Sequence, residues 1–205
     1  CSSDLVQLWR EYDRRPLSDA QLQYISGSGT RAQQIILARF YLDAGESDKA
    51  KRLISGLFDE HVLDGQALMA RIMLAQGDKK NAYQLASRVL AADARNEDAL
   101  LVRAARSLAE RNPDRAIEDA NVVVSDSPEN YLGYVELARA YIAKGQDIRA
   151  RQTFERGMDF LPQSFQLADA YRAFLLSVGD RQRAVTLDQD VAMAKPSSVR
   201  AWSIY

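Results

Sequence analysis

The sequence has almost none of the residues that build metal centres or disulfide frameworks. Its 205 residues include one cysteine, Cys1, and one histidine, His61. Disulfide frameworks and zinc sites need several such side chains, so the composition excludes both. No apolar run approaches the length of about 18 residues that a membrane-spanning helix needs.

The charges are balanced, and the residues that interrupt helices are scarce. Lysine and arginine number 27 and aspartate and glutamate 28, which gives a net charge of −1. Such a chain has no global field that would hold it on nucleic acid or on an anionic membrane. Its 10 glycines and 5 prolines fall mostly at expected turns, while 27% charged and 47% hydrophobic residues are ordinary for a globular domain.

Sequence motifs of catalysis are also missing. The chain contains no G-x-G-x-x-G, no phosphate-binding G-x-x-x-x-G-K-[ST], no G-x-S-x-G and no H-E-x-x-H. The acidic pairs 59–60 and 97–98 fall at expected helix starts and turns, where we expect solvated roles or roles that complement the helix dipole. The sequence therefore predicts no enzyme activity, no cofactor and no metal.

A helix–turn–helix pattern is clearest in residues 134–162. Leu137 and Ala138 share one helical face with Tyr141, Gly145 breaks the helix, and a second amphipathic helix follows. Neither helix can bury its apolar face alone, so the unit needs neighbours.

The same pattern recurs along the chain. A small residue five places after the turn returns at steps of 32, 34, 34 and 34 residues, as Ala50, Ala82, Ala116, Ala150 and Ala184. The turn position holds Gly45, Gly77, Arg111, Gly145 and Gly179. A period that is kept in phase through five units predicts stacked helical hairpins.

This period, with its Leu-Ala pair, Tyr, turn Gly, Ala and final Pro, resembles the tetratricopeptide repeat (TPR). The resemblance implies an all-α fold, a right-handed superhelical solenoid of helix–turn–helix repeats with N-terminal capping helices. Five repeats are expected, at 31–62, 63–96, 97–130, 131–164 and 165–198. The second departs from the pattern at Met69 and Met73, and the fifth has Arg172 where a small residue is usual.

The segments that flank the repeats do not follow the pattern. Residues 1–30 are expected to form an N-terminal anchor and capping helices, with Gly27-Ser28-Gly29 as a tight connection. Thr30, with Gln33 three residues later, predicts a capping box that opens the first repeat. Residues 199–205, which include Trp202, are expected to start a sixth repeat or to form a C-terminal cap.

A chain that begins Cys1-Ser2-Ser3 resembles a mature bacterial lipoprotein, in which the first cysteine carries lipid. The resemblance implies lipidation of Cys1, and Ser2 in the second place implies the periplasmic face of the outer membrane. The alternative for Cys1 is an arbitrary boundary of the sequence or the trimming of disordered residues, and the alternative localisation is cytoplasmic.

In TPR proteins the first helix of each repeat lines the concave face, so the resemblance implies a partner-binding groove there. The expected groove residues are Arg39, Leu42, Arg71, Leu74, Leu101, Leu108, Val135, Arg139, Ile142 and Leu176. Aliphatic side chains with arginines in register suit a helical or extended protein segment that carries acidic groups. The alternative is that the aliphatic side chains pack inside the solenoid and the arginines pair with local carboxylates.

The function expected from these resemblances is that of a non-enzymatic protein–protein interaction scaffold. The favoured form is an outer-membrane lipoprotein that assists assembly of a pilus or secretion system, similar to pilotins or to the tight-adherence (Tad) pilus assembly lipoprotein. The expected partner is a subunit of an envelope complex, with no nucleic acid and with membrane contact only through lipid on Cys1. A soluble cytoplasmic adaptor or co-chaperone, and a periplasmic component of polysaccharide export or outer-membrane assembly, stay open as alternatives.

Overall fold

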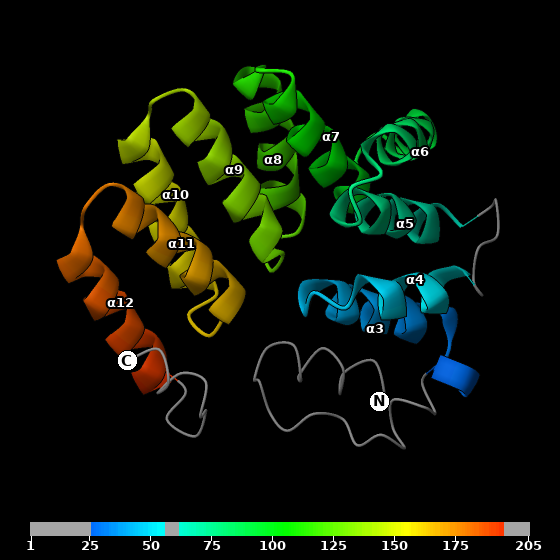
Figure 1. Ribbon diagram of the computed structural model, residues 1–205, viewed down its shortest axis with the longest axis horizontal. Helices are drawn as coiled ribbons and strands as arrows, with labels where there is room; N and C mark the ends of the chain where they lie inside the picture. The colour runs from blue at the N-terminus through cyan, green and yellow to red at the C-terminus, as the bar shows by residue number, and fades with distance from the viewer. Residues whose placement is uncertain (1–25, 56–61, 195–205) are drawn as a thin grey trace. The chain divides into compact units, whose positions relative to one another are not determined.

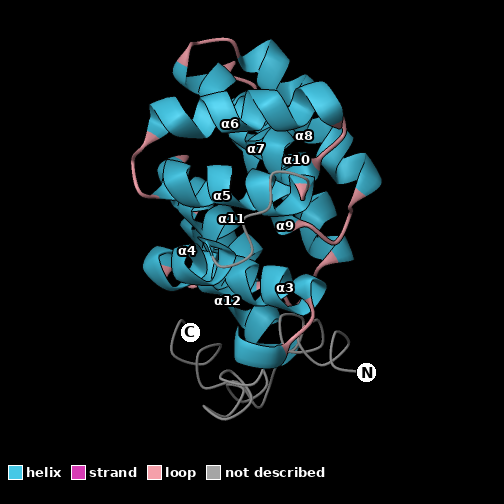
Figure 2. Cartoon of the chain, turned by 90° about the vertical axis from the view of Figure 1, so that its right-hand side faces the viewer, coloured by secondary structure: helices cyan, strands magenta, loops and turns pink. Residues whose placement is uncertain are grey.

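The computed structural model describes residues 26–55 and 62–194, and this part of the chain contains helices and loops but no strand (Figure 2). The helices with defined bounds are α3 (Arg31–Asp43), α4 (Ser47–Ser55), α5 (Leu63–Ala75), α6 (Lys79–Ala92), α7 (Glu97–Ala109), α8 (Pro113–Asp126), α9 (Tyr131–Ala143), α10 (Asp147–Phe160), α11 (Phe165–Ser177) and α12 (Arg181–Ala194) (Figure 1). The prediction of an all-α fold is confirmed.

The chain forms two compact units, residues 1–106 and 107–205. In the first unit, α3 pairs with α4 and α5 pairs with α6, and the two first helices α3 and α5 also touch. In the second unit, α9 pairs with α10 and α11 with α12, and the first helices α9 and α11 touch in the same way. Each unit is therefore built from helical hairpins whose first helices lie side by side.

The periodic alanines identified in the sequence are buried inside the hairpins. Their exposed fractions are 0% at the first four positions and 3% at the fifth, for Ala50, Ala82, Ala116, Ala150 and Ala184. Because protein interiors are packed to crystal-like density, we expect a larger side chain at these buried positions to displace its neighbours.

The predicted turn position adopts the left-handed backbone in every hairpin. The φ angles are 79°, 85°, 57°, 69° and 82° at Gly45, Gly77, Arg111, Gly145 and Gly179. Glycine is the usual residue there because it has no Cβ to clash with the backbone. Arg111 is the one non-glycine residue with positive φ among the described residues, which confirms that it occupies the turn position of its repeat.

Local signals place several helix starts correctly. Thr30 and Gln33 form the predicted capping box, with the Thr30 N–H donating to Gln33 Oε1 at 2.8 Å and the Gln33 N–H donating to Thr30 Oγ1 at 3.3 Å. Pro113 is the first residue of α8, where its missing N–H costs nothing. The prediction of a loop at Gly27 and Ser28 is wrong, because both residues are helical. The Gln34 side chain donates to the Ser26 carbonyl at 2.9 Å and so fixes this turn to α3.

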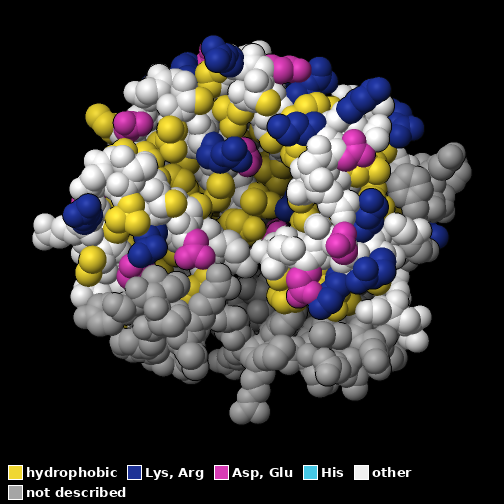
Figure 3. Space-filling view, viewed as in Figure 1, with side chains coloured by type: hydrophobic (Ala, Val, Ile, Leu, Met, Phe, Trp, Pro, Cys, Tyr) yellow, Lys and Arg dark blue, Asp and Glu magenta, His cyan; other side chains and the backbone are white. Residues whose placement is uncertain are grey.

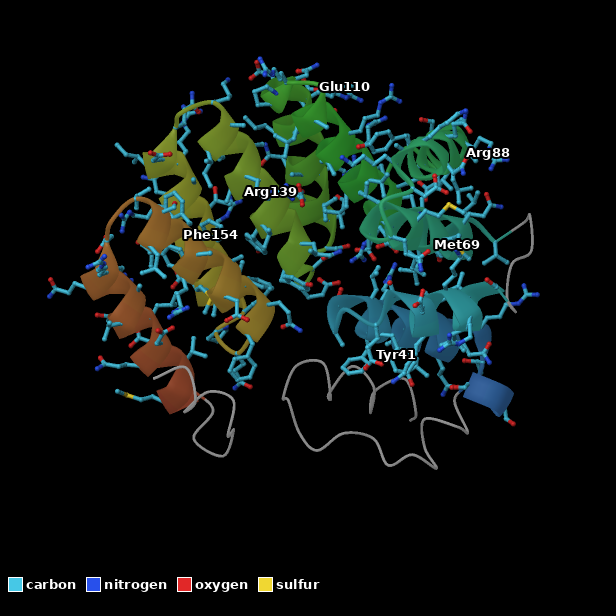
Figure 4. The ribbon with its side chains drawn as sticks, viewed as in Figure 1. Tyr41, Met69, Arg88, Glu110, Arg139 and Phe154 are labelled. Atoms are coloured by element: carbon cyan, nitrogen blue, oxygen red, sulfur yellow. The ribbon has the colours of Figure 1, made fainter. Side chains whose placement is uncertain are left out.

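Aromatic side chains fill the core of the second unit. The Phe154 ring stacks on Tyr171 with 5.2 Å between centroids, and Tyr134 lies in the same buried cluster (Figure 4). Gly157 on α10 is in close contact with this cluster, because a Cβ built on it would lie 2.9 Å from Tyr134 Cγ and 2.9 Å from Leu167 Cδ2. Here glycine is needed for the approach of neighbouring helices, not for its backbone angles.

Several predictions fall on residues that the structure does not describe. They concern the lipid-bearing Cys1, the N-terminal capping helices around Trp9, the turn at His61 and the start of a sixth repeat at Trp202, all of which lie outside the described ranges.

Candidate functional site

The predicted groove residues of the first unit include two arginines that converge on one carboxylate. Arg39 on α3 donates from Nε and Nη2 to Asp98 Oδ2, at 3.1 Å and 2.7 Å. Arg71 on α5 donates from Nη1 to Asp98 Oδ1 at 2.7 Å. Asp98 belongs to the first turn of α7, so one side chain connects the first helices of three consecutive hairpins.

Two further carboxylates complete this arrangement. Arg39 Nη2 lies 2.8 Å from Glu97 Oε1, and Arg71 Nη2 lies 3.4 Å from Asp43 Oδ1. We call these five residues the Asp98 network. Each arginine fork contacts carboxylate oxygens with more than one nitrogen, the geometry in which guanidinium groups bind most specifically.

The network is largely withdrawn from solvent. The Asp98 side chain is 1% exposed, and those of Arg39 and Arg71 are 20% and 11% exposed. Burial alone would raise the pKa of Asp98, but the charges and hydrogen bonds of the two arginines hold that pKa below its ordinary value of 3.8. Burial opposes the charge of Arg39 as well, and Asp98 and Glu97 together raise its pKa. Arg39 and Arg71 therefore pair with carboxylates of their own chain, which is the alternative to partner binding stated above for the groove arginines.

The sequence predicts a solvated or dipole-complementing role for Asp98. Its place in the first turn of α7 agrees with the dipole-complementing role, but the side chain is 1% exposed, so the solvated role is wrong. The side chain is buried between helices because two arginines reach it from segments 59 and 27 residues away. One signal was present in the sequence. Asp98 precedes Leu101 by three residues and Leu108 by ten, so it lies on the same helical stripe as the predicted groove residues of its repeat.

The aliphatic positions of the predicted groove differ in exposure, also within the second unit. Leu42 and Leu74 in the first unit are half-buried, and Leu101 is only 5% exposed. The equivalent second-unit positions Ile142 and Leu176 are 40% and 43% exposed. Among the predicted groove aliphatics in the described ranges, these two present the most apolar surface to solvent. Leu108 and Val135 are half-buried.

Arg139 is a third predicted groove residue of the second unit that is exposed. Its side chain is 57% exposed and its Nη1 lies 2.7 Å from Glu136 Oε1, one turn earlier on α9 (Figure 4). Only the arginine end of this pair is exposed, because the Glu136 side chain is 11% exposed. Losing Arg139 would leave that carboxylate nearly buried without this cation, which is costly, so we expect Arg139 to keep Glu136. We call Arg139, Ile142 and Leu176 the α9–α11 strip, after the two touching helices that carry it; Figure 3 shows apolar side chains beside a basic one over α9.

Other chemistry finds no support in the described part of the chain. Residues 26–55 and 62–194 contain no group of three or more His, Cys, Asp or Glu side chains placed to hold a metal ion. No described helix is both long and apolar enough to cross a bilayer. The α9–α11 strip combines aliphatic surface with one cation, which suits binding of a protein segment.

Comparison with known proteins agrees with this architecture. The family model described as "Tetratricopeptide repeat" matches residues 107–173. The fold is that of tetratricopeptide repeats. No curated protein matches the chain.

Solved structures share the TPR fold at low sequence identity. A thermophilic TPR protein of Thermus thermophilus, TTC0263, is similar with a TM-score of 0.68 and 16% identity, over 85% of this chain and 98% of its own. PilF of Pseudomonas aeruginosa gives a TM-score of 0.57 and 18% identity, over 83% of this chain and 79% of its own. MamA gives 0.52 and 14% identity, over 76% and 92%. TPR proteins bind other proteins, so this fold supports a role as a protein-interaction scaffold.

Proposed function

We propose that this TPR protein is a non-enzymatic scaffold that binds a protein segment along the α9–α11 strip. The observation that carries the proposal is the exposure of Ile142 and Leu176 at equivalent positions of adjacent first helices, 34 residues apart. Single exposed aliphatic residues are common on protein surfaces. Two of them in register on touching helices, with the exposed Arg139 one turn away, form a repeated contact surface.

The surface defines the chemistry of its partner. Ile142 and Leu176 would contact apolar side chains, and Arg139 would keep Glu136 while its other guanidinium N–H groups bind a carboxylate of the partner. A helical or extended segment with apolar residues and an acidic one has these features. We limit the proposed contacts to the second unit, because Arg39 and Arg71 already hold Asp98.

A photocrosslinking experiment tests this contact in cells. A photoreactive amino acid at position 142 or 176 should crosslink the same protein, and one at position 148 should not. Ile148 on α10 is the matched control, because it is an isoleucine of the same unit with 76% exposure that lies outside the strip. Crosslinks from position 148 to the same protein at equal yield would contradict the proposed site.

A more specific proposal concerns the cellular setting in which this protein acts. We propose an outer-membrane lipoprotein that assists assembly of a pilus or secretion system, with the partner segment supplied by a subunit of that machine. The similarity to PilF is compatible with this setting but is a likeness of fold at 18% identity. A cytoplasmic adaptor and a periplasmic component of polysaccharide export are the competing settings.

Whether Cys1 carries a lipid distinguishes the outer-membrane setting from the cytoplasmic one. Mass spectrometry of the native protein isolated from cell membranes should show an acylated Cys1. An unmodified Cys1 in a protein recovered from the cytoplasm would contradict the outer-membrane setting while leaving the α9–α11 strip untouched.

A further inference from the structure

A second surface lies on the first unit and uses the second helix of a hairpin. Six residues line an open hollow with a volume of about 680 Å3: Lys80, Tyr83, Gln84, Ser87, Arg88 and Arg106. Five of them lie on α6 at spacings of three, one, three and one residues, which place them on one continuous face of the helix. We call this hollow the α6 groove.

The charge of the α6 groove has one sign. Three of its six lining residues are cationic, and no carboxylate is among them. Figure 4 shows Arg88 on α6, and dark blue side chains gather over this helix in Figure 3. In a chain with a net charge of −1, a hollow lined only by cations and neutral groups is a local exception.

Two of these cations, Lys80 and Arg88, differ from Arg39 and Arg71 of the same unit. Arg39 and Arg71 are held by carboxylates of the Asp98 network. Lys80 and Arg88 are exposed, and neither forms an ion pair with any residue in the described ranges. Within residues 26–55 and 62–194, their charges are therefore available to a ligand without the loss of an ion pair.

The floor of the groove is ordered by an aromatic contact. The Arg106 guanidinium lies over the Tyr83 ring, 5.6 Å from its centroid, which is within the range of a cation–π interaction. The Ser87 hydroxyl donates to the Tyr83 carbonyl at 2.8 Å. Between the flanking cations the groove thus presents a half-buried ring, an amide and a hydroxyl group.

We propose that the α6 groove binds an acidic protein segment, as a second docking surface beyond the α9–α11 strip. Lys80 and Arg88 are eight residues apart on α6, which corresponds to roughly 12 Å along the helix axis. An extended segment spans that distance in about four residues, so two carboxylates in such a segment can meet both cations while the residues between them contact Tyr83 and Gln84. The volume is in the range of roughly 300–1,000 Å3 that is typical of ligand sites.

Fluorescence anisotropy with labelled probes tests the proposal on the full chain. The probe is a fluorescein-labelled peptide of about ten residues in which glutamate alternates with serine, long enough to reach both cations. A peptide with glutamine in place of glutamate, and a single-stranded DNA of about ten nucleotides, are the comparison probes. We expect the glutamate peptide to bind more tightly than either, and its affinity to fall as NaCl rises from about 50 mM to about 500 mM.

Charge reversal in the groove should remove this binding. Lys80→Glu/Arg88→Glu is expected to weaken the glutamate peptide at least about tenfold. The matched control is Lys51→Glu/Lys79→Glu, which makes the same change of charge at two exposed lysines of the same unit outside the groove. This control should bind within about threefold of the wild type. Thermal melts check the fold, and Lys80→Gln/Arg88→Gln replaces the reversal if that variant does not fold.

Four results would overturn the proposal. Two concern the peptides: the wild type does not bind the glutamate peptide, or it binds the glutamine peptide with equal affinity. The others are an equal loss of affinity in the control variant, or tighter binding of the DNA than of the glutamate peptide that is lost in the groove variant. The last result would assign the groove to nucleic acid. Ile142→Asp should leave binding of the glutamate peptide unchanged, so failure at this groove and failure at the α9–α11 strip are separate results.

Discussion

Asp98 is the residue on which the first helices of the first unit converge. It is almost fully buried and accepts hydrogen bonds from arginines of α3 and α5. Without Asp98, Arg39 still contacts Glu97 and Arg71 still contacts Asp43, but both largely buried cations lose the carboxylate that they share. Removing one member of a buried charge group costs more than the intact group contributes.

We therefore expect Asp98→Ala to lower the free energy of unfolding by about 3–5 kcal/mol, measured by urea denaturation. Asp114→Ala is the matched control, because Asp114 also pairs with a cation but is 73% exposed. Its effect should stay within about 1 kcal/mol. Equal effects of the two substitutions would show that the Asp98 network is not a buried structural group.

The same residue predicts a pH dependence. The pKa of Asp98 is lowered in the folded protein, so its ionised form is stabilised by folding. Its contribution is complete above the unfolded pKa of about 3.9 and is lost as pH falls through the lower folded pKa. The stability difference between wild type and Asp98→Asn should be constant from about pH 7 to about pH 5 and shrink below about pH 4. A difference that grows on acidification would contradict the lowered pKa.

Gly157 sets the separation of neighbouring helices in the second unit. In Gly157→Ala, the new methyl group would lie 2.9 Å from both Tyr134 and Leu167, and we expect a loss of about 1–3 kcal/mol despite the better helix propensity of alanine. Gly65→Ala is the control, because the nearest atom to a Cβ there is 3.7 Å away. Thermal melts should show a lower Tm for Gly157→Ala alone; an unchanged Tm would mean that the helices can separate freely.

At the scale of the element, each hairpin depends on one left-handed residue between its helices. Arg111 holds this conformation at a φ of 57°, and a side chain there costs roughly 1–2 kcal/mol relative to glycine. Arg111→Gly should therefore stabilise the protein, by up to about 1 kcal/mol after the larger entropy of the unfolded glycine is included. Chemical denaturation measures the change, and a clear loss of stability would show that the Arg111 side chain makes contacts that outweigh its backbone strain.

The element scale also shows what the sequence can predict. The alanine positions and the turn residue were located correctly, including Arg111 in place of glycine, because they follow from one period and from local backbone geometry. The role of Asp98 was not predicted, because it depends on contacts between helices 27 and 59 residues apart in sequence. Pairings of that kind follow from how helices stack, which periodicity alone does not specify.

For the whole molecule, we propose that the two units differ in function. The predicted groove residues were the same residue types in both, and the sequence could not tell which would face solvent. The structure separates them: Arg39 and Arg71 hold a buried carboxylate, whereas Arg139, Ile142 and Leu176 are exposed. We therefore propose that the second unit binds protein, whereas the Asp98 network connects helices within the first unit.

The most direct test of this account is the affinity of the crosslinked partner segment for matched variants. Ile142→Asp and Leu176→Asp each place a carboxylate in the strip and should raise Kd at least about tenfold. Ile148→Asp makes the same change at a more exposed isoleucine of the same unit. Isothermal titration calorimetry on folded variants should find its Kd within about twofold of wild type. Equal affinities for Ile142→Asp, Leu176→Asp and wild type would contradict the claim that the α9–α11 strip is the binding surface.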